Sequence, residues 1–149
     1  MTSTSTTHET RVQQLMAERA AALRAGDAER VVAQYAPDAV VCDLAPPLRR
    51  PADEVCDPNR VANWLAGFAG PVDVEFRDLT VTAGDDVAFC HGLARLTATP
   101  RGAADAFTLW YRITVGLRLV DGDWRITHEH ESTPFHMDGS FRAAVDLEP

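Results

Sequence analysis

The sequence predicts an α+β fold in which helices pack on one face of a curved antiparallel sheet. Apolar residues follow helical spacing in roughly the first 70 positions, and apolar and polar residues alternate after them. No linker or internal repeat divides the 149 residues, which is the size of one ordinary domain. We therefore expect a single domain over 9–149. The preceding Ser/Thr-rich residues 1–8 have little to bury and are expected to form a disordered leader.

Two helices joined at a glycine are predicted at the start of this domain. The first covers 9–25, where the apolar stripe has helical spacing and alanines fill the remainder. Gly26 is a typical C-terminal cap, and Asp27 can cap a second helix that ends before Pro37.

A long loop and a third helix follow the first short strand. The segment 44–58 contains four prolines, which predicts a surface loop of the kind that often serves as a lid or binding loop. Asp57 and Pro58 are a typical helix start, and the apolar spacing after them predicts a helix that ends near Gly70.

Five segments have the β-branched content or alternation of strands. They cover 38–44, 72–83, 87–99, 107–120 and 124–132. Short polar turns join the last four, so these four are expected to form an antiparallel meander.

The composition excludes several kinds of partner. The net charge of −8 and the pI near 5.0 argue against binding to nucleic acid or to an anionic membrane surface. No apolar run approaches the ~20 residues that a membrane-spanning helix needs. Three cysteines without CxxC spacing are typical of reduced thiols, so a cytoplasmic location is expected.

The last strand, WRITHEHES, carries a dense group of ionisable residues. With regular alternation, His128 and His130 share the face of Trp124 and Ile126. Because the apolar face must cover the helices, this places both histidines on the inner face.

The same alternation places Glu129 and Glu131 on the outer face. There they could meet Arg112 and Arg118 of the preceding strand across the ladder. A β-bulge would reverse this assignment, and strongly curved sheets often contain one.

Two runs of the sequence resemble ketosteroid isomerases and SnoaL-like polyketide cyclases of the nuclear transport factor two-like superfamily. They are AALRAGDAERVVAQYAPDAVVCDLAPP over 21–47 and the closing hairpin VDGDWRITHEH. The resemblance implies a cone-shaped curved sheet with three helices, an apolar pocket, and frequent dimers. It also implies that Asp43 is a general base. The isomerases' oxyanion-donating tyrosine aligns with Arg19 and their partner acid falls near Val115, which argues against true steroid isomerase activity.

Asp43, His128 and His130 are the catalytic candidates. Asp43 could instead be a strand-end residue that is hydrogen-bonded to the following loop, and the histidines could tie the C-terminal tail to the sheet. With His91, the two histidines could also form a three-histidine metal site. The candidate substrate-binding residues are Arg19, Tyr35, Trp64, Phe68, His91 and Tyr111.

The sequence favours an enzyme without cofactor or metal that isomerises, cyclises or dehydrates an apolar polyketide-like or aromatic substrate by acid–base catalysis. Arg19 would stabilise an anion, and the outer sheet face would form a homodimer. The alternative is a non-catalytic ligand-binding or dimeric assembly module of the same fold.

Overall fold

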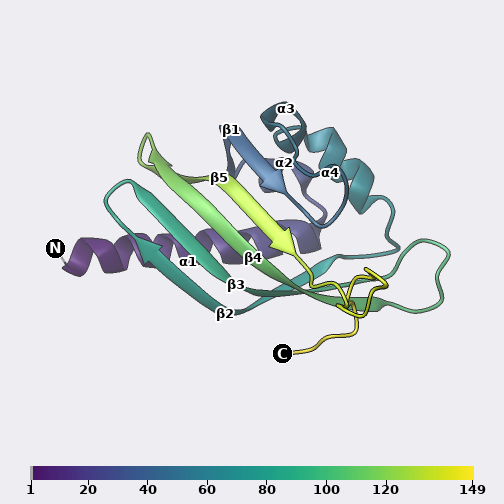
Figure 1. Ribbon diagram of the computed structural model, residues 1–149. Coiled ribbons are helices and arrows are strands. Elements are labelled where there is room, and N and C mark those ends of the chain that lie inside the picture. The colour runs from purple at the N-terminus through teal and green to yellow at the C-terminus, as the bar shows by residue number, and fades with distance from the viewer. Residues whose placement is uncertain (1) are drawn as a thin grey trace.

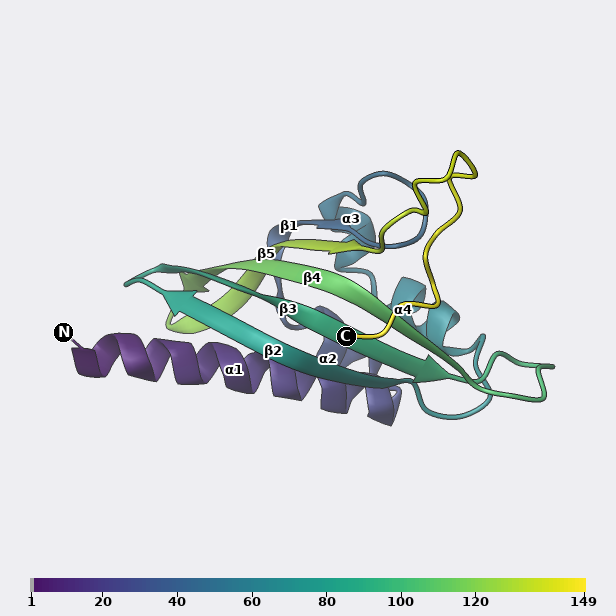
Figure 2. The same ribbon diagram turned by 60° about the horizontal axis from the view of Figure 1, so that its bottom comes forward.

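The computed structural model describes residues 2–149 and confirms an α+β fold in which helices pack on one face of a curved, open sheet (Figures 1 and 2). The helices are α1 (Thr2–Ala25), α2 (Ala28–Val32), α3 (Ala52–Val55) and α4 (Pro58–Leu65). The strands are β1 (Tyr35–Cys42), β2 (Asp73–Ala83), β3 (Val87–Ala98), β4 (Phe107–Val120) and β5 (Asp123–Ser132).

The sheet has the strand order β1-β5-β4-β3-β2. Strands β2 to β5 form the predicted antiparallel meander, whereas β1 pairs in parallel with β5 at the edge. The sheet is therefore mixed rather than wholly antiparallel. This parallel pairing brings Asp43, which directly follows β1, beside the end of β5.

The helical hairpin agrees with the sequence prediction, but its first helix is longer. Gly26 has a φ of +68°, and the Asp27 side chain accepts a hydrogen bond from the Arg30 backbone N–H. The sequence predicted a disordered leader over 1–8, whereas the structure assigns residues 2–8 to α1; Met1 lies outside the described residues. The Trp124 indole N–H donates to His8 Nδ1 over 3.2 Å, and this contact ties the beginning of α1 to the sheet.

The proline-rich segment is more ordered than a simple loop. It contains α3 and a cis peptide bond between Pro46 and Pro47. Asp57 caps α4 as predicted, but this helix ends at Leu65 rather than near Gly70.

Two β-bulges interrupt the meander of β2–β5, and a further register shift lies in β1 between Tyr35 and Val40. One lies in β2 at Asp78, opposite Gly92, and shifts the register between Arg77 and Thr80. An added Cβ at Gly92 would lie 2.9 Å from the Arg77 carbonyl oxygen, so the bulge leaves no room for a side chain there. The other lies at Thr127, because Ile126 pairs with Leu117 while His128 pairs with Gly116.

The core fills one half of the inner face of the sheet. Buried residues of α1 pack there against β4 and β5, including Val12, Met16, Ile113, Leu117 and Ile126. A smaller cluster joins α1, α2 and α4 and contains Ala22, Leu23, Val31 and Val61. Among the described residues, no helix has the length and apolar character to span a membrane.

Candidate functional site

A cavity of about 380 Å³ lies on the inner side of the sheet, and some of the core residues, including Tyr35 and Tyr111, also line it. Its apolar wall includes Trp64, Phe68, Leu96, Phe107 and Leu109. Its polar lining consists of Arg19, Tyr35, Asp43, Arg50, Arg60, Tyr111, Glu129 and Glu131. A mostly apolar cavity with convergent polar groups is typical of a small-molecule site.

The bulge at Thr127 determines which side chains of β5 enter this cavity. Ile126 and Glu129 are both buried, although they are three residues apart, and His128 and His130 are exposed. The extra residue reverses the alternation after Ile126, and the Thr127 hydroxyl donates to the Gly116 carbonyl oxygen over 3.3 Å. The predicted inner placement of the histidines is therefore wrong, and Glu129 and Glu131 line the cavity instead.

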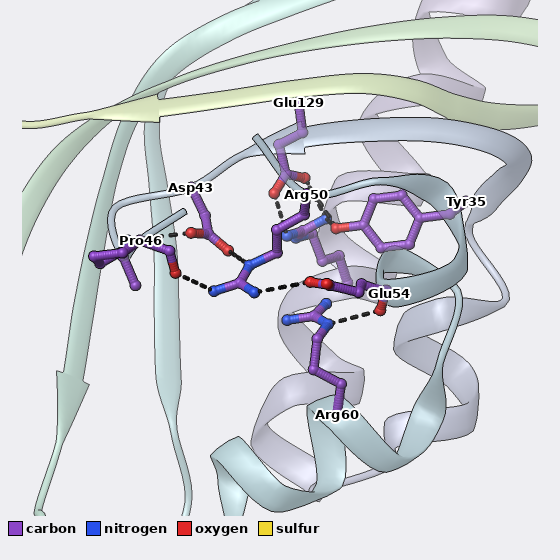
Figure 3. Close-up of polar contacts among 9 residues, drawn as sticks. Tyr35, Asp43, Pro46, Arg50, Glu54, Arg60 and Glu129 are labelled. Atoms are coloured by element: carbon purple, nitrogen blue, oxygen red, sulfur yellow. Dashed lines mark hydrogen bonds and ion pairs between the residues drawn. The ribbon is translucent and has the colours of Figure 1, made fainter. Parts of the chain in front are cut away.

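A buried ion pair lies at the inner end of the cavity. Arg19 Nη1 is 2.6 Å from Glu129 Oε1, and Arg19 Nη2 donates to Glu129 Oε2 over 2.9 Å. The Tyr35 hydroxyl accepts from Arg19 Nη1 over 2.9 Å and donates to Glu129 Oε1 over 3.3 Å. Glu129 is only 2% exposed, so the arginine and the phenol replace the water that this carboxylate has lost (Figure 3).

Glu131 follows two positions along the same face, and no basic side chain within residues 2–149 lies at ion-pair distance from it. Burial raises the pKa of its carboxyl group well above the ordinary value, and the charge of Glu129 raises this pKa further. A side-chain hydrogen bond with Glu129 also raises this pKa, while the charge of Arg19 lowers it. The surroundings of Glu131 thus favour the protonated form of its carboxyl group.

The phenols of the cavity are held in their neutral form. Burial raises the pKa values of both Tyr35 and Tyr111, which keeps their hydroxyl groups protonated as hydrogen-bond donors. Together with Glu131, they form a set of neutral donors around one carboxylate–guanidinium pair.

A second carboxylate lies at the loop side of the cavity. Asp43 Oδ2 accepts from Arg50 Nε over 2.7 Å, and Asp43 Oδ1 accepts from the Ala45 backbone N–H over 3.1 Å. Arg50 also donates to the Pro46 carbonyl oxygen over 2.9 Å and to Glu54 over 3.3 Å (Figure 3). Asp43 therefore lines the cavity and also makes the loop hydrogen bond that the sequence left as an alternative.

The structure brings together six of the nine predicted site residues. Asp43 and five of the candidate substrate-binding residues line the cavity: Arg19, Tyr35, Trp64, Phe68 and Tyr111. His91 lies exposed on the outer face of β3, and His128 and His130 lie on the outer face of β5.

The three-histidine metal site is not supported. Over residues 2–149 no group of three or more histidine, cysteine, aspartate or glutamate side chains is placed to hold a metal ion. The rings of His128 and His130 are 6.5 Å apart and belong to a surface that faces away from the cavity.

The predicted outer-face ladder contacts are also wrong. Arg112 donates to the Ser132 hydroxyl, and Arg118 bonds to both carboxylate oxygens of Asp38, so neither meets a glutamate of β5.

Sequence reasoning missed Glu129, Glu131, Arg50 and Arg60 as cavity residues. One signal for the glutamates was present, because an arginine on the apolar stripe of the first helix needs a buried carboxylate partner. Glu129 is that partner, and its identity required knowledge of the bulge.

Comparison with known proteins agrees with this architecture. The family model described as a SnoaL-like domain matches residues 12–136. No curated protein sequence matches the chain. The crystal structure of an NTF2-like protein of unknown function from Pseudomonas putida is similar, with 32% identity, a TM-score of 0.84, and coverage of 97% of this chain and 99% of that one.

Two further solved structures share the fold. One is a proposed calcium/calmodulin-dependent protein kinase II association domain from Xanthomonas campestris, with 25% identity, a TM-score of 0.69, and coverage of 81% of this chain and 84% of that one. The other is a proposed scytalone dehydratase from Novosphingobium aromaticivorans, with 17% identity, a TM-score of 0.76, and coverage of 97% and 95%. The family match over most of the chain and the fold together show that this protein belongs to the SnoaL-like family of the nuclear transport factor two-like superfamily.

Proposed function

We propose that this protein is a cofactor-independent isomerase, cyclase or dehydratase that moves protons within a small apolar, polyketide-like or aromatic substrate. The observation that carries this proposal is that Glu131, whose carboxyl pKa is raised by burial, shares the cavity with Asp43, which is paired with Arg50. A carboxyl group with a raised pKa and a second carboxylate in one cavity are suited to act as an acid and a base in one reaction.

In the proposed mechanism, Asp43 removes a proton from a carbon beside a carbonyl group. Glu131 donates its proton to the oxygen that gains charge: the carbonyl oxygen in an isomerisation or cyclisation, or the leaving hydroxyl group in a dehydration, which then departs as water. In an isomerisation, Asp43 returns its proton to a different carbon while the enol hydroxyl returns a proton to Glu131. In a cyclisation or a dehydration, proton transfer from Asp43 to Glu131, directly or through water, restores the starting state. Arg50 positions Asp43 through the 2.7 Å hydrogen bond from Nε to Oδ2. Arg19 and Tyr35 hold the side chain of Glu129 in place beside Glu131.

The proposal differs from the sequence expectation in the identity of the acid. His128 and His130 are exposed on the opposite face of β5, so Glu131 takes the role that the sequence assigned to them. The resemblance in fold to a proposed scytalone dehydratase is compatible with dehydration as one of the three reaction types.

A deuterium-exchange assay tests the proposal before the substrate is known. The protein would be incubated in D2O with a panel of cyclic enones and hydroxylated aromatic ketones, and deuterium at carbon would be measured by mass spectrometry. We expect protein-dependent exchange into at least one compound. Both Asp43→Asn and Glu131→Gln should slow it by about 100-fold or more.

His128→Ala is the matched control, because it alters the opposite face of the same strand and should exchange like the original protein. Full exchange activity in Asp43→Asn or in Glu131→Gln would remove that residue from the mechanism. Loss of activity in His128→Ala would return the acid role to the histidines.

A second candidate function is a non-catalytic ligand-binding or assembly module that forms a homodimer through the outer sheet face. The supporting observation is an exposed aromatic and basic surface there: Phe89 is 47% exposed, and the guanidinium of Arg77 stacks 4.6 Å from the Trp110 ring centroid. The similarity of this fold to that of the proposed association domain from Xanthomonas campestris favours the same interpretation. Light scattering would show a dimer that Trp110→Asp dissociates, whereas a monomer would reject this candidate.

The cytoplasmic location remains a proposal that rests on three unpaired cysteines, Cys42, Cys56 and Cys90.

A further inference from the structure

Three arginines line the cavity, and they differ in how their charges are balanced. Arg19 is paired with Glu129, and Arg50 is paired with both Asp43 and Glu54. Arg60 donates from Nε to the Glu54 carbonyl oxygen over 2.8 Å, and within residues 2–149 it has no carboxylate at ion-pair distance. The terminal nitrogens of Arg60 are therefore the cavity's unmatched cationic donors in the part of the chain that the structure describes.

The placement of Arg60 is fixed by its own helix. Arg60 and Trp64 are four residues apart on α4, one helical turn, and both side chains line the cavity. The hydrogen bond from Nε anchors the guanidinium to the end of α3, as the close-up shows (Figure 3). A half-buried arginine thus lies one helical turn from Trp64, at the spacing that separates the Cβ atoms of such neighbours by about 5–6 Å.

We propose that the cavity selects ligands that carry a carboxylate group, and that Arg60 binds this carboxylate while the ligand's apolar ring lies against Trp64 and Phe68. This inference names the substrate class of the same site and rests on the proposed function for its catalytic meaning. Arg60 is then a specificity-determining residue, and the substrates are apolar ring acids rather than neutral ring compounds.

Charge and shape both support this assignment. The chain has a net charge of −8, so its overall field repels anions and a local cation is needed to hold one. A guanidinium with two free terminal nitrogens fits a carboxylate in the bidentate geometry that arginine favours. Partial enclosure strengthens this interaction, because the surrounding wall is largely apolar.

The ring end of the ligand has a matching environment. Trp64 and Phe68 contact each other edge to face with ring centroids 5.3 Å apart, and Phe107 continues this wall at 6.3 Å from Phe68. A flat bicyclic ring that lies against this aromatic wall can direct one carboxylate toward Arg60, which is one helical turn from Trp64. The reacting part of a larger substrate would then extend toward Glu131 and Asp43.

The test is a binding comparison of two probes of nearly identical shape, 2-naphthoate and 2-naphthamide, by calorimetry at neutral pH. We expect the original protein to bind naphthoate at least about tenfold more tightly than naphthamide, a difference of about 1.4 kcal/mol. Arg60→Gln should bind the two probes equally, because the glutamine keeps a donor for the Glu54 carbonyl but lacks the charge.

Arg101→Gln is the matched control. Arg101 also donates from Nε to a backbone carbonyl, that of Ala66 over 2.6 Å, but it does not line the cavity. This variant should keep the preference for naphthoate. Equal affinities in the original protein, absence of naphthoate binding, or a preference that survives in Arg60→Gln would each overturn the inference.

Glu131→Gln separates this inference from the proposed function. It should keep the preference for naphthoate while losing deuterium exchange. A protein that prefers naphthoate through Arg60 but catalyses no exchange would support the specificity inference and reject the enzyme. Exchange without any preference for the carboxylate would do the reverse.

Discussion

The two faces of β5 differ in how they treat ionisable side chains. On the cavity face, Glu129 is 2% exposed and is bound by a guanidinium and a phenol, and burial raises the pKa of the Glu131 carboxyl group. On the opposite face, His128 and His130 are exposed to solvent, and the nearest aromatic partner of each is the other. Four consecutive residues thus contribute to two environments, and only the buried one needs compensating charges.

The functional site of β5 is therefore identified by the buried charges that need partners, and not by the number of ionisable residues in the segment. An exposed histidine needs no partner, whereas the buried carboxylate of Glu129 is bound by Arg19 from α1 and Tyr35 from β1. Four predictions, in order of decreasing effect, test the contrast between the two faces.

The largest effect is expected from Arg19→Met, which leaves Glu129 buried without a cation. The free energy of unfolding should fall by about 3–5 kcal/mol, as measured by urea denaturation. The additional change Glu129→Leu should restore much of this loss, because it removes the uncompensated charge.

The matched control is Arg24→Met on the same helix. Arg24 also lies 2.6 Å from a carboxylate, that of Asp73, but its side chain is 71% exposed. Its loss should cost no more than about 1 kcal/mol. Equal losses in the two variants would contradict the special status of the buried pair.

A smaller effect is expected from Gly92→Ala, which tests the bulge in β2. The new methyl carbon would lie 2.9 Å from the Arg77 carbonyl oxygen and 3.1 Å from Leu79 Cα, both in the backbone. The strand must shift, so a loss of about 1–3 kcal/mol is expected in the same denaturation assay.

Gly116→Ala provides the comparison at the bulge in β5. Its added Cβ would lie 3.6 Å from His128 Cβ, an ordinary contact on the outer face. The change should stay within about 0.5 kcal/mol. A larger loss here than at Gly92 would mean that the bulge at Thr127 is the tighter of the two.

Glu131→Gln is expected to stabilise the fold at neutral pH. The folded-state pKa of Glu131 is raised above its ordinary value of 4.5. Below that value both states are protonated, and the carboxyl group imposes no pH-dependent penalty. As the pH rises from there toward the folded-state pKa, the unfolded state releases the proton first, and stability falls by up to about 1.4 kcal/mol per pH unit.

The glutamine removes this titration while its amide can still donate to Glu129. Thermal melts of the original protein and the variant should therefore coincide at acid pH and separate as the pH rises. Glu75→Gln is the control. Glu75 lies on β2, its side chain is half exposed, and its Oε2 is 2.5 Å from Nη2 of Arg95 on β3. A constant difference across the pH range would mean that Glu131 is ionised in the folded protein.

The sequence predicts the fold well because the fold depends on periodicities that survive local irregularity. Several short patterns each specify one local structure: Gly26 with Asp27, the turn at 121–123, and the apolar alternation of β4. The order of these structures along the chain specifies the α+β architecture. The parallel edge pairing of β1 was not foreseen, since it joins segments about ninety residues apart.

The site was predicted only in part, for a reason that is local to β5. Arg19 and Tyr35 lie on regular elements and Asp43 directly follows β1, so the position of these three residues at the cavity does not depend on the bulge. The residues after Thr127 were misplaced because one extra residue reverses every later side chain in a strand of period two. No sequence pattern at Thr127 identifies a bulge. The reversal is recognised only from the residue pairing between β4 and β5.

The smallest effect is expected from His128→Ala and His130→Ala, which test the outward assignment most directly. Each imidazole is exposed, so each variant should change the free energy of unfolding by less than about 0.5 kcal/mol. Neither should alter the binding of 2-naphthoate measured by calorimetry, because neither side chain reaches the cavity. If binding weakened in both variants while Glu131→Gln left it intact, the histidines would face the ligand and the bulge would lie elsewhere in β5. If binding is unchanged, the reversal at Thr127 is what gives the cavity its carboxyl groups.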